Sequence, residues 1–83
     1  MKVTLIGLKS VDFTDDNGKR VEGYNMYIGY PDANTVGQAT DRQFIFKERL
    51  EGFGVTAKEL EEFVNGEISI EYNKQGKICA VSV

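Results

Sequence analysis

Two short segments with the same turn chemistry constrain the fold of this chain more than any other feature. The first is Asp15-Asp16-Asn17-Gly18 and the second is Asn73-Lys74-Gln75-Gly76. Their asparagine and glycine residues tolerate the positive φ values that a tight hairpin connection requires. Because apolar and polar residues alternate before and after these segments, the sequence predicts two antiparallel hairpins, one near each end of the chain.

The first hairpin is expected to begin with a long strand over residues 1–14. Gly7 lies near its middle and predicts a bend, which would let this strand pair in two parts of a sheet. Ile6 and Leu8 fall on one face by alternation. The opposite face groups four apolar side chains, Val3, Leu5, Val11 and Phe13.

A second strand is expected over residues 19–30, with one apolar and one polar face. Its even positions are Tyr24, Met26, Ile28 and Tyr30. Tyr27 falls on the other face, between Asn25 and Gly29. A tyrosine on a polar face is a candidate for ligand stacking or for a subunit interface.

A third strand is expected over residues 40–48, after a loop over residues 31–39 that contains proline and glycine. Phe44 and Phe46 lie on one side of it, and Ile45 lies on the other side between polar residues. Because phenylalanine is usually buried, we expect Phe44 and Phe46 in the core. The same expectation holds for Phe63 and Tyr72.

One helix is predicted, over residues 56–64. Thr56 is a good N-cap, and Glu59 stands three residues later, which is the spacing of a capping box. Leu60, Phe63 and Val64 form an apolar stripe at helical spacing, and Asn65-Gly66 ends the helix. The stretch from Leu50 to Gly54 is expected to be a glycine-rich loop. A helix this short must pack on the rest of the domain to persist.

Two final strands, over residues 67–73 and 77–83, complete the order β-β-β-α-β-β. A small chain must cover its sheet edges as well as bury its apolar faces. Five strands closed into a barrel, with the helix at one end, satisfy both needs, as in the five-stranded Greek-key barrel of the OB-fold. We therefore expect a mainly β, OB-like single domain over residues 1–83. An SH3-like barrel is the alternative, and a β-grasp arrangement fits less well because its helix would follow the first hairpin.

Composition excludes several classes of function. The 83 residues contain no histidine and one cysteine, Cys79, so an internal disulfide and the usual zinc and haem sites have no ligand set. Catalysis by serine–histidine or cysteine–histidine pairs is excluded for the same reason. No apolar run approaches the ~20 residues of a membrane span. We expect a cytoplasmic protein that is not an enzyme and uses no metal or cofactor.

The net charge of −3 is unevenly distributed along the chain. Residues 48–71 contain seven of the thirteen acidic residues but only two of the ten basic ones. This concentration leaves another part of the surface free to be locally basic. The alternative is that these charges are ordinary solvated groups, since a strongly basic footprint is absent.

Aromatic and basic residues interleave on the second and third strands. OB barrels that bind single strands combine a basic groove with rings on which bases stack, at ~1–3 kcal/mol per base. Tyr24 and Tyr30 have an alternative role as edges of the core, and Lys19 and Arg20 as a solvated hairpin tip. The candidate nucleic-acid-binding residues are Lys19, Arg20, Tyr24, Tyr27, Tyr30, Arg42 and Lys47.

The sequence also resembles a known group of proteins. The carrying segments are Val11-Asp12-Phe13-Thr14, Asn17-Gly18, Glu22-Gly23, Met26-Tyr27 and the closing Glu71-Tyr72-Asn73-Lys74-Gln75-Gly76-Lys77. They are similar to small proteins of Gram-positive phages and conjugative elements, which in turn resemble the gene V type of single-stranded DNA-binding protein from filamentous phages. The resemblance implies an OB-like dimer whose first hairpin is a DNA-binding wing carrying Lys19, Arg20, Tyr24 and Tyr27.

Two functional hypotheses follow from these observations. The leading one is a sequence-independent, dimeric single-stranded DNA-binding protein of a phage or mobile element. The other is an OB-like protein–protein interaction module without nucleic-acid binding, in which Tyr27 and Ile45 anchor an interface.

Overall fold

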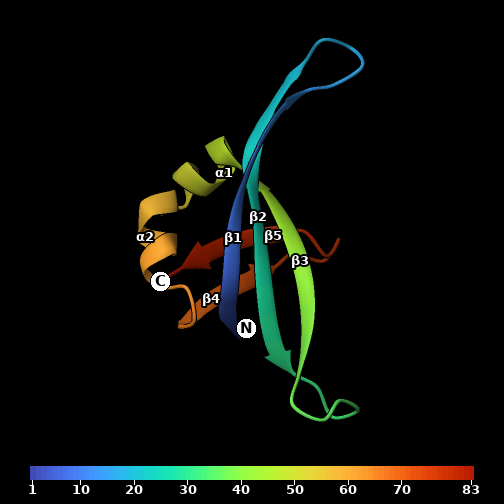
Figure 1. Cartoon of the computed structure of the whole chain (residues 1–83), viewed down its shortest axis with the longest axis vertical. Helices are drawn as coiled ribbons and strands as arrows, with labels where there is room; N and C mark the ends of the chain where they lie inside the picture. The colour runs from blue at the N-terminus through green and yellow to red at the C-terminus, as the bar shows by residue number, and fades with distance from the viewer.

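Five antiparallel strands form one sheet, with two short helices beside it, in the computed structural model that describes residues 1–83 (Figure 1). The strand order in the sheet is β3-β2-β1-β4-β5. The prediction of a mainly β fold with five strands is therefore confirmed. The strands are β1 (Lys2–Thr14), β2 (Arg20–Pro31), β3 (Gln38–Phe46), β4 (Glu67–Tyr72) and β5 (Ile78–Ser82), and the helices are α1 (Lys47–Gly52) and α2 (Ala57–Glu62).

Both predicted hairpin turns are present and share one hydrogen-bond pattern. In the first turn, Asp15 Oδ1 accepts hydrogen bonds from the backbone N–H groups of Asn17 and Lys19, at 3.0 and 2.8 Å. Asn73 accepts the equivalent pair in the second turn. The glycine that ends each turn has a φ of 79° or 77°, which a residue with a Cβ adopts at a steric cost. Local sequence therefore specifies both connections.

Strand β1 pairs with two partners, as its central glycine predicted. Residues 2–4 pair with β4, and residues 4–14 pair with β2. A β-bulge between Leu5 and Gly7 marks the change, with Ile6 as the extra residue. One inserted residue reverses the side-chain parity of everything after it. The expectation that Val11 and Phe13 share a face with Leu5 is therefore wrong.

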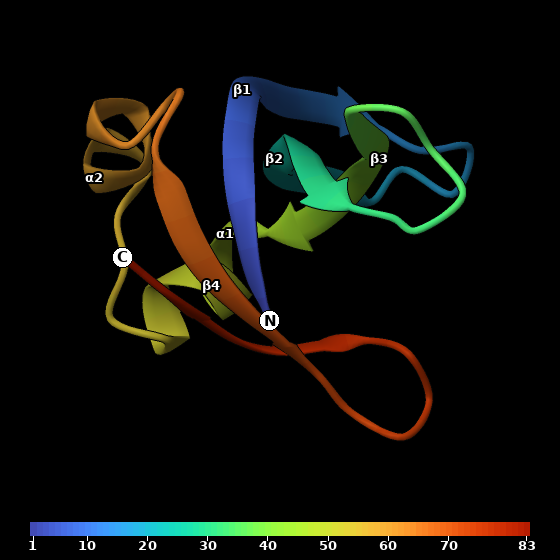
Figure 2. The same ribbon diagram turned by 90° about the horizontal axis from the view of Figure 1, so that it is seen from below.

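The core is one cluster. Every strand, both helices and the loop between the helices contribute side chains to it. Leu50 of α1 and Leu60 of α2 are buried in it beside the central strands. The sheet is strongly twisted, since β4 and β5 run steeply across the direction of β1 in Figure 1, while β4 and β1 converge toward the N-terminus in Figure 2. The twelve buried residues are Val3, Leu5, Met26, Ile28, Ile45, Leu50, Val55, Leu60, Ile68, Ile70, Ile78 and Val81.

The sheet remains open, because β3 and β5 lie at its two ends and do not pair. One side chain crosses from α1 to the start of β5. Arg49 donates hydrogen bonds from Nη2 and Nε to the carbonyl oxygen of Ile78, at 2.7 and 3.2 Å. Neither helix is long and apolar enough to cross a membrane.

The helical region differs from the expectation of a single helix over residues 56–64. The predicted cap is confirmed, since Thr56 Oγ1 accepts the backbone N–H of Glu59 at 3.1 Å. Helix α2 ends earlier, and Phe63 is its C-cap with 37% of its surface exposed, so the prediction that Phe63 is buried is wrong. Helix α1 was not expected. Its first five residues, Lys47 to Glu51, are strong helix formers, but the helix has no side-chain N-cap and contains a single buried residue.

The two faces of β3 are the reverse of the expected assignment, in which Phe44 and Phe46 face the core. Ile45 is 2% exposed and belongs to the core, whereas Phe44 and Phe46 are 38% and 53% exposed. The pairing partner sets this parity, because Ile45 lies opposite Tyr24 on the face toward the core. Residue size alone had suggested the opposite assignment.

Candidate nucleic-acid interface

The outer face of the β1–β2–β3 sheet, meaning the face turned away from the core, carries the candidate site. Cross-strand register arranges its side chains in rows, because residues opposite each other in antiparallel strands share a face. None of the rows contains an aspartate or a glutamate. The central rows are Gly7–Tyr27–Arg42, Lys9–Asn25–Phe44 and Val11–Gly23–Phe46.

The aromatic rings of the outer face lie over glycines. A Cβ added to Gly23 would stand 2.6 Å from the ring of Phe44, so this ring occupies the space above the glycine backbone. Phe44 also packs edge-on against Phe46, with ring centroids 5.0 Å apart. The ring of Tyr27 lies beside Gly7, where an added Cβ would stand at an ordinary contact distance of 3.7 Å. The Phe44 ring is therefore the one that needs a glycine beneath it to pack close to the strands.

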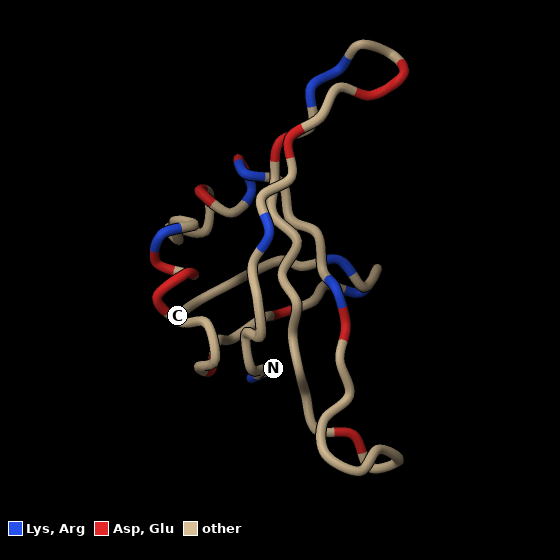
Figure 3. Tube along the Cα trace, viewed as in Figure 1, with Lys and Arg blue, Asp and Glu red and all other residues tan.

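Two cations of the outer face are free of ion pairs. Arg42 lies opposite Tyr27, and Lys9 lies opposite Asn25. The four ion pairs of the chain involve other groups. Strand β2 lies between β1 and β3 and has no charged residue from Gly23 to Pro31, which is the uncharged stretch drawn in tan in Figure 3.

A shallow recess of about 680 Å³ lies at the Tyr27–Arg42 row. Ile6, placed outward by the bulge, forms one wall beside Gly7. The nearest carboxylate is Asp41 at the rim. It accepts the backbone N–H of Arg42 and the side-chain amide of Gln43, both at 2.7 Å, so part of its hydrogen-bonding capacity is used within the strand.

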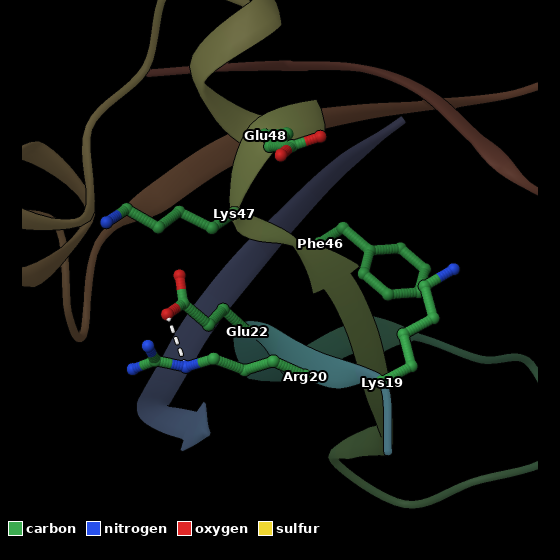
Figure 4. Close-up of a pocket in the computed structure, with 6 residues that line it drawn as sticks. All are labelled: Lys19, Arg20, Glu22, Phe46, Lys47 and Glu48. Carbon is green, nitrogen blue, oxygen red and sulfur yellow. Dashed lines mark ion pairs between the residues drawn. The ribbon is translucent and has the colours of Figure 1, made fainter. Parts of the chain in front are cut away.

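A second recess, of about 500 Å³, lies where the first hairpin leaves the body of the sheet. Figure 4 shows the side chain of Lys19 beside the ring of Phe46, and Lys47 extending in a different direction. Arg20 reaches Glu22 at 2.9 Å. The lining residues are Lys19, Arg20, Glu22, Phe46, Lys47 and Glu48.

Arg20 is held by carboxylates on the face opposite to the aromatic rings. Its Nη2 and Nε donate to Asp12 at 2.8 and 3.1 Å. The hydrogen bond from Arg20 lowers the pKa of Asp12, and the same bond raises the pKa of the guanidinium. Arg20 is consequently a paired charge, less available to a phosphate than Arg42.

The structure brings some of the predicted site residues together and separates others. Tyr27 and Arg42 are cross-strand neighbours on the outer face. Lys19 lies at the hairpin end of that face, beside Phe46. Tyr24 and Tyr30 are half-buried and pack against the core, which was the alternative role for both. Arg20 and Lys47 lie with Glu22 and Glu48.

Sequence reasoning missed three members of the outer face. Phe44 and Phe46 were assigned to the core because of their size, and Lys9 was not considered. No sequence signal identified this face, because each of the three strands contains a single acidic residue, Asp12, Glu22 or Asp41. Only the cross-strand register places all three on the face toward the core.

Comparison with known proteins identifies no relative of this chain. No protein-family model matches the sequence, and no curated protein or solved structure shows significant similarity. The functional argument therefore rests on the outer face.

Proposed function

We propose that this chain is a non-enzymatic protein that binds single-stranded DNA without reading its sequence, with the outer face as the binding surface. One observation carries the proposal. The rings of Tyr27, Phe44 and Phe46 share a sheet face with Lys9 and Arg42, and the cross-strand rows of that face contain no aspartate or glutamate. Bases stack on exposed rings at ~1–3 kcal/mol each, in any sequence, while cations neutralise the phosphates.

The order of the side chains suggests a path for the strand along the sheet. Tyr27, Phe44 and Phe46 follow one another toward the first hairpin, where Lys19 adds a third cation beside the last ring. With three phosphates neutralised, the logarithm of affinity should fall with the logarithm of salt concentration with a slope of about −2. Stacking supplies most of the affinity at such a site.

The same proposal includes the finer description of the fold and its setting. The sheet is an OB-like barrel, partly open between β3 and β5, and the protein is a dimer serving a phage or mobile element in the cytoplasm. Two features support it: β1 pairs with both β2 and β4, and the helices lie between β3 and β4 in the chain. The resemblance to gene V-type proteins supports the dimeric state and the phage or mobile-element setting.

Fluorescence anisotropy of a labelled oligo-dT tests the proposal. Anisotropy should rise with protein at low salt and fall when salt is added. Phe44→Ala should weaken binding by about 5- to 150-fold, since one stacking platform is lost. Phe63→Ala is the matched control, because Phe63 is 37% exposed, like Phe44, but lies outside the outer face. A flat titration of the wild type, or equal losses in both variants, contradicts the proposal.

A protein–protein interaction module is the second candidate. Ile6, Phe13 and Phe46 expose apolar side chains on the outer face, and aromatic side chains are enriched at protein interfaces. In that case Tyr27→Ala should lower the sedimentation coefficient, while oligo-dT, duplex DNA and RNA titrations all remain flat.

A further inference from the structure

Asn25 carries the one side-chain amide in the three central rows of the outer face. It lies opposite Lys9 of β1 and opposite Phe44 of β3. Aromatic rings flank it on both sides along its own strand. Tyr27 is the next residue of β2 on the same face, and the Phe44 ring occupies the space above Gly23, the preceding residue on that face. A flat ligand stacked on either ring therefore has an edge beside this amide.

The amide of Asn25 has no partner within the chain. None of the side-chain hydrogen bonds of the structure involves it. The residue is half-buried, yet no buried polar side-chain atom lacks a hydrogen-bond partner, so the amide nitrogen and oxygen must be accessible. An accessible and unpaired amide between two rings is available to a ligand.

The chemistry of a carboxamide matches one edge of every nucleobase. A carboxamide holds a donor and an acceptor side by side in one plane. The Watson–Crick edge of each base does the same, with N6–H beside N1 in adenine, N4–H beside N3 in cytosine, N1–H beside O6 in guanine and N3–H beside O4 in thymine. The terminal torsion of asparagine is roughly two-fold, so the amide can meet the donor and acceptor in either order.

Building on the proposed function, we propose that Asn25 binds the Watson–Crick edge of a base stacked on Tyr27 or Phe44 and thereby selects unpaired bases. The contact does not discriminate between sequences, because all four bases present the same pair of groups. In a duplex, that edge is already bonded to the complementary base, and Asn25 gains no contact. Stacking and phosphate neutralisation supply the rest of the affinity.

The other polar groups of the central rows cannot replace this amide. Lys9 and Arg42 have hydrogen-bond donors only, which suit the oxygens of phosphates. The Tyr27 hydroxyl donates and accepts through a single atom, which cannot span the donor and the acceptor of a base edge. Asn25 is therefore the residue of these rows that determines the specificity for unpaired bases.

Titrations of two thymidine oligomers of equal length test this contact. One is oligo-dT, and the other is built from N3-methylthymidine, in which a methyl group replaces the N3–H donor of the Watson–Crick edge. The wild type should bind oligo-dT about 2- to 12-fold more tightly, as expected for the net gain from one hydrogen bond. Asn25→Ala should lower the affinity for oligo-dT to that for the methylated oligomer. Fluorescence anisotropy measures both affinities.

Two further variants separate the lost amide from other effects. Asn34→Ala is the matched control, because Asn34 is an exposed asparagine in the loop between β2 and β3, beyond the central rows. It should keep the wild-type ratio of the two affinities. Asn25→Val removes the amide but favours a strand, so it should lose the preference just as Asn25→Ala does. Thermal unfolding shows that each variant is folded at the temperature of the titrations.

The outcomes distinguish this inference from the proposed function. Equal affinities of the wild type for the two oligomers, or an unchanged preference in Asn25→Ala and Asn25→Val, overturn the role of Asn25. If the wild type binds both oligomers equally and loses both when salt is added, the proposed function stands and this inference alone is rejected. If the wild type binds neither oligomer, both are rejected.

Discussion

The two faces of the β1–β2–β3 sheet are built from alternate residues of the same strands, yet they have opposite chemistry. The inner face supplies buried aliphatic side chains such as Leu5, Ile28 and Ile45. The outer face holds aromatic rings and unpaired cations. The carboxylates Asp12 and Glu22 fall with the inner set. The single carboxylate of each of these strands, Asp12, Glu22 or Asp41, therefore lies on the inner side, and seven more acidic residues are concentrated in residues 48–71.

In the first hairpin, the side chains on the inner side of the strands extend beyond the core and are charged instead of apolar. Its strands continue past the end of β3, to the pair Thr14 and Arg20. There Arg20 bridges Asp12 and Glu22, and the three charges satisfy one another. On the outer side, Phe13 remains 52% exposed. The difference between the faces thus extends along the hairpin, which contributes to the 43 Å length of the molecule (Figure 1).

The largest expected effect is a loss of unfolding free energy, compared between two neighbouring residues of β2 that lie on opposite faces. Ile28→Ala should lower the free energy of unfolding by about 2–5 kcal/mol, because it removes a buried side chain and leaves a cavity. Tyr27→Ala should cost about 1 kcal/mol or less, as expected for a partly exposed position. Urea denaturation measures both values. Equal losses would mean that the outer face is part of the core and not a free surface.

A smaller effect is expected where the aromatic platform depends on a glycine. Gly23→Ala should destabilise the fold by about 1–3 kcal/mol, since its Cβ would meet the Phe44 ring and the carbonyl oxygen of Ile45. Gly52→Ala is the control, because a Cβ there meets nothing within 4 Å. Thermal unfolding of both variants measures the difference. An unchanged Gly23→Ala variant would mean that the ring does not need the glycine surface.

The third prediction compares a cation from each face. Arg42→Gln should reduce the magnitude of the salt slope of oligo-dT binding by about 0.7, the contribution of one phosphate contact. Arg20→Gln should leave the slope nearly unchanged, because Arg20 is already paired with Asp12 and Glu22. Anisotropy titrations over a series of salt concentrations provide both slopes. The reverse result would move the phosphate path to the other face.

The smallest effect concerns alkaline pH. Burial, with smaller contributions from Asp41 and Tyr30, raises the pKa of Tyr72 above 10.0. A pKa raised by folding contributes stability below pH 10 that is lost as the pH rises through the folded-state value. Wild-type stability should fall over this range, and Tyr72→Phe should reduce the fall. Thermal unfolding between pH 8 and about 11 tests this difference.

Sequence reasoning succeeded where the controlling interactions are local. Both hairpin turns are governed by a side chain and a glycine within five residues, and the Thr56 cap by a residue three positions away. Tyr27 was placed correctly outside the core because its neighbours Met26 and Ile28 alternate cleanly with it. Arg42 was named as a candidate for its charge on the third strand, and its position opposite Tyr27 comes from the strand register.

The remaining features depend on interactions between distant residues. The bulge at Ile6 reverses the parity of β1, and it is visible only once β1 is paired with β2. The exposure of Phe44 and Phe46 depends on which residues of β2 lie opposite, since three adjacent bulky residues suit either face. Helix α1 is held by the burial of Leu50 in a core assembled from the whole chain. The sequence by itself thus determined the turns, the strands and the helix cap, because short-range hydrogen bonds and backbone geometry specify them. Only the tertiary structure decided which side of each strand faces solvent, because register and burial are set by partners far away in the chain.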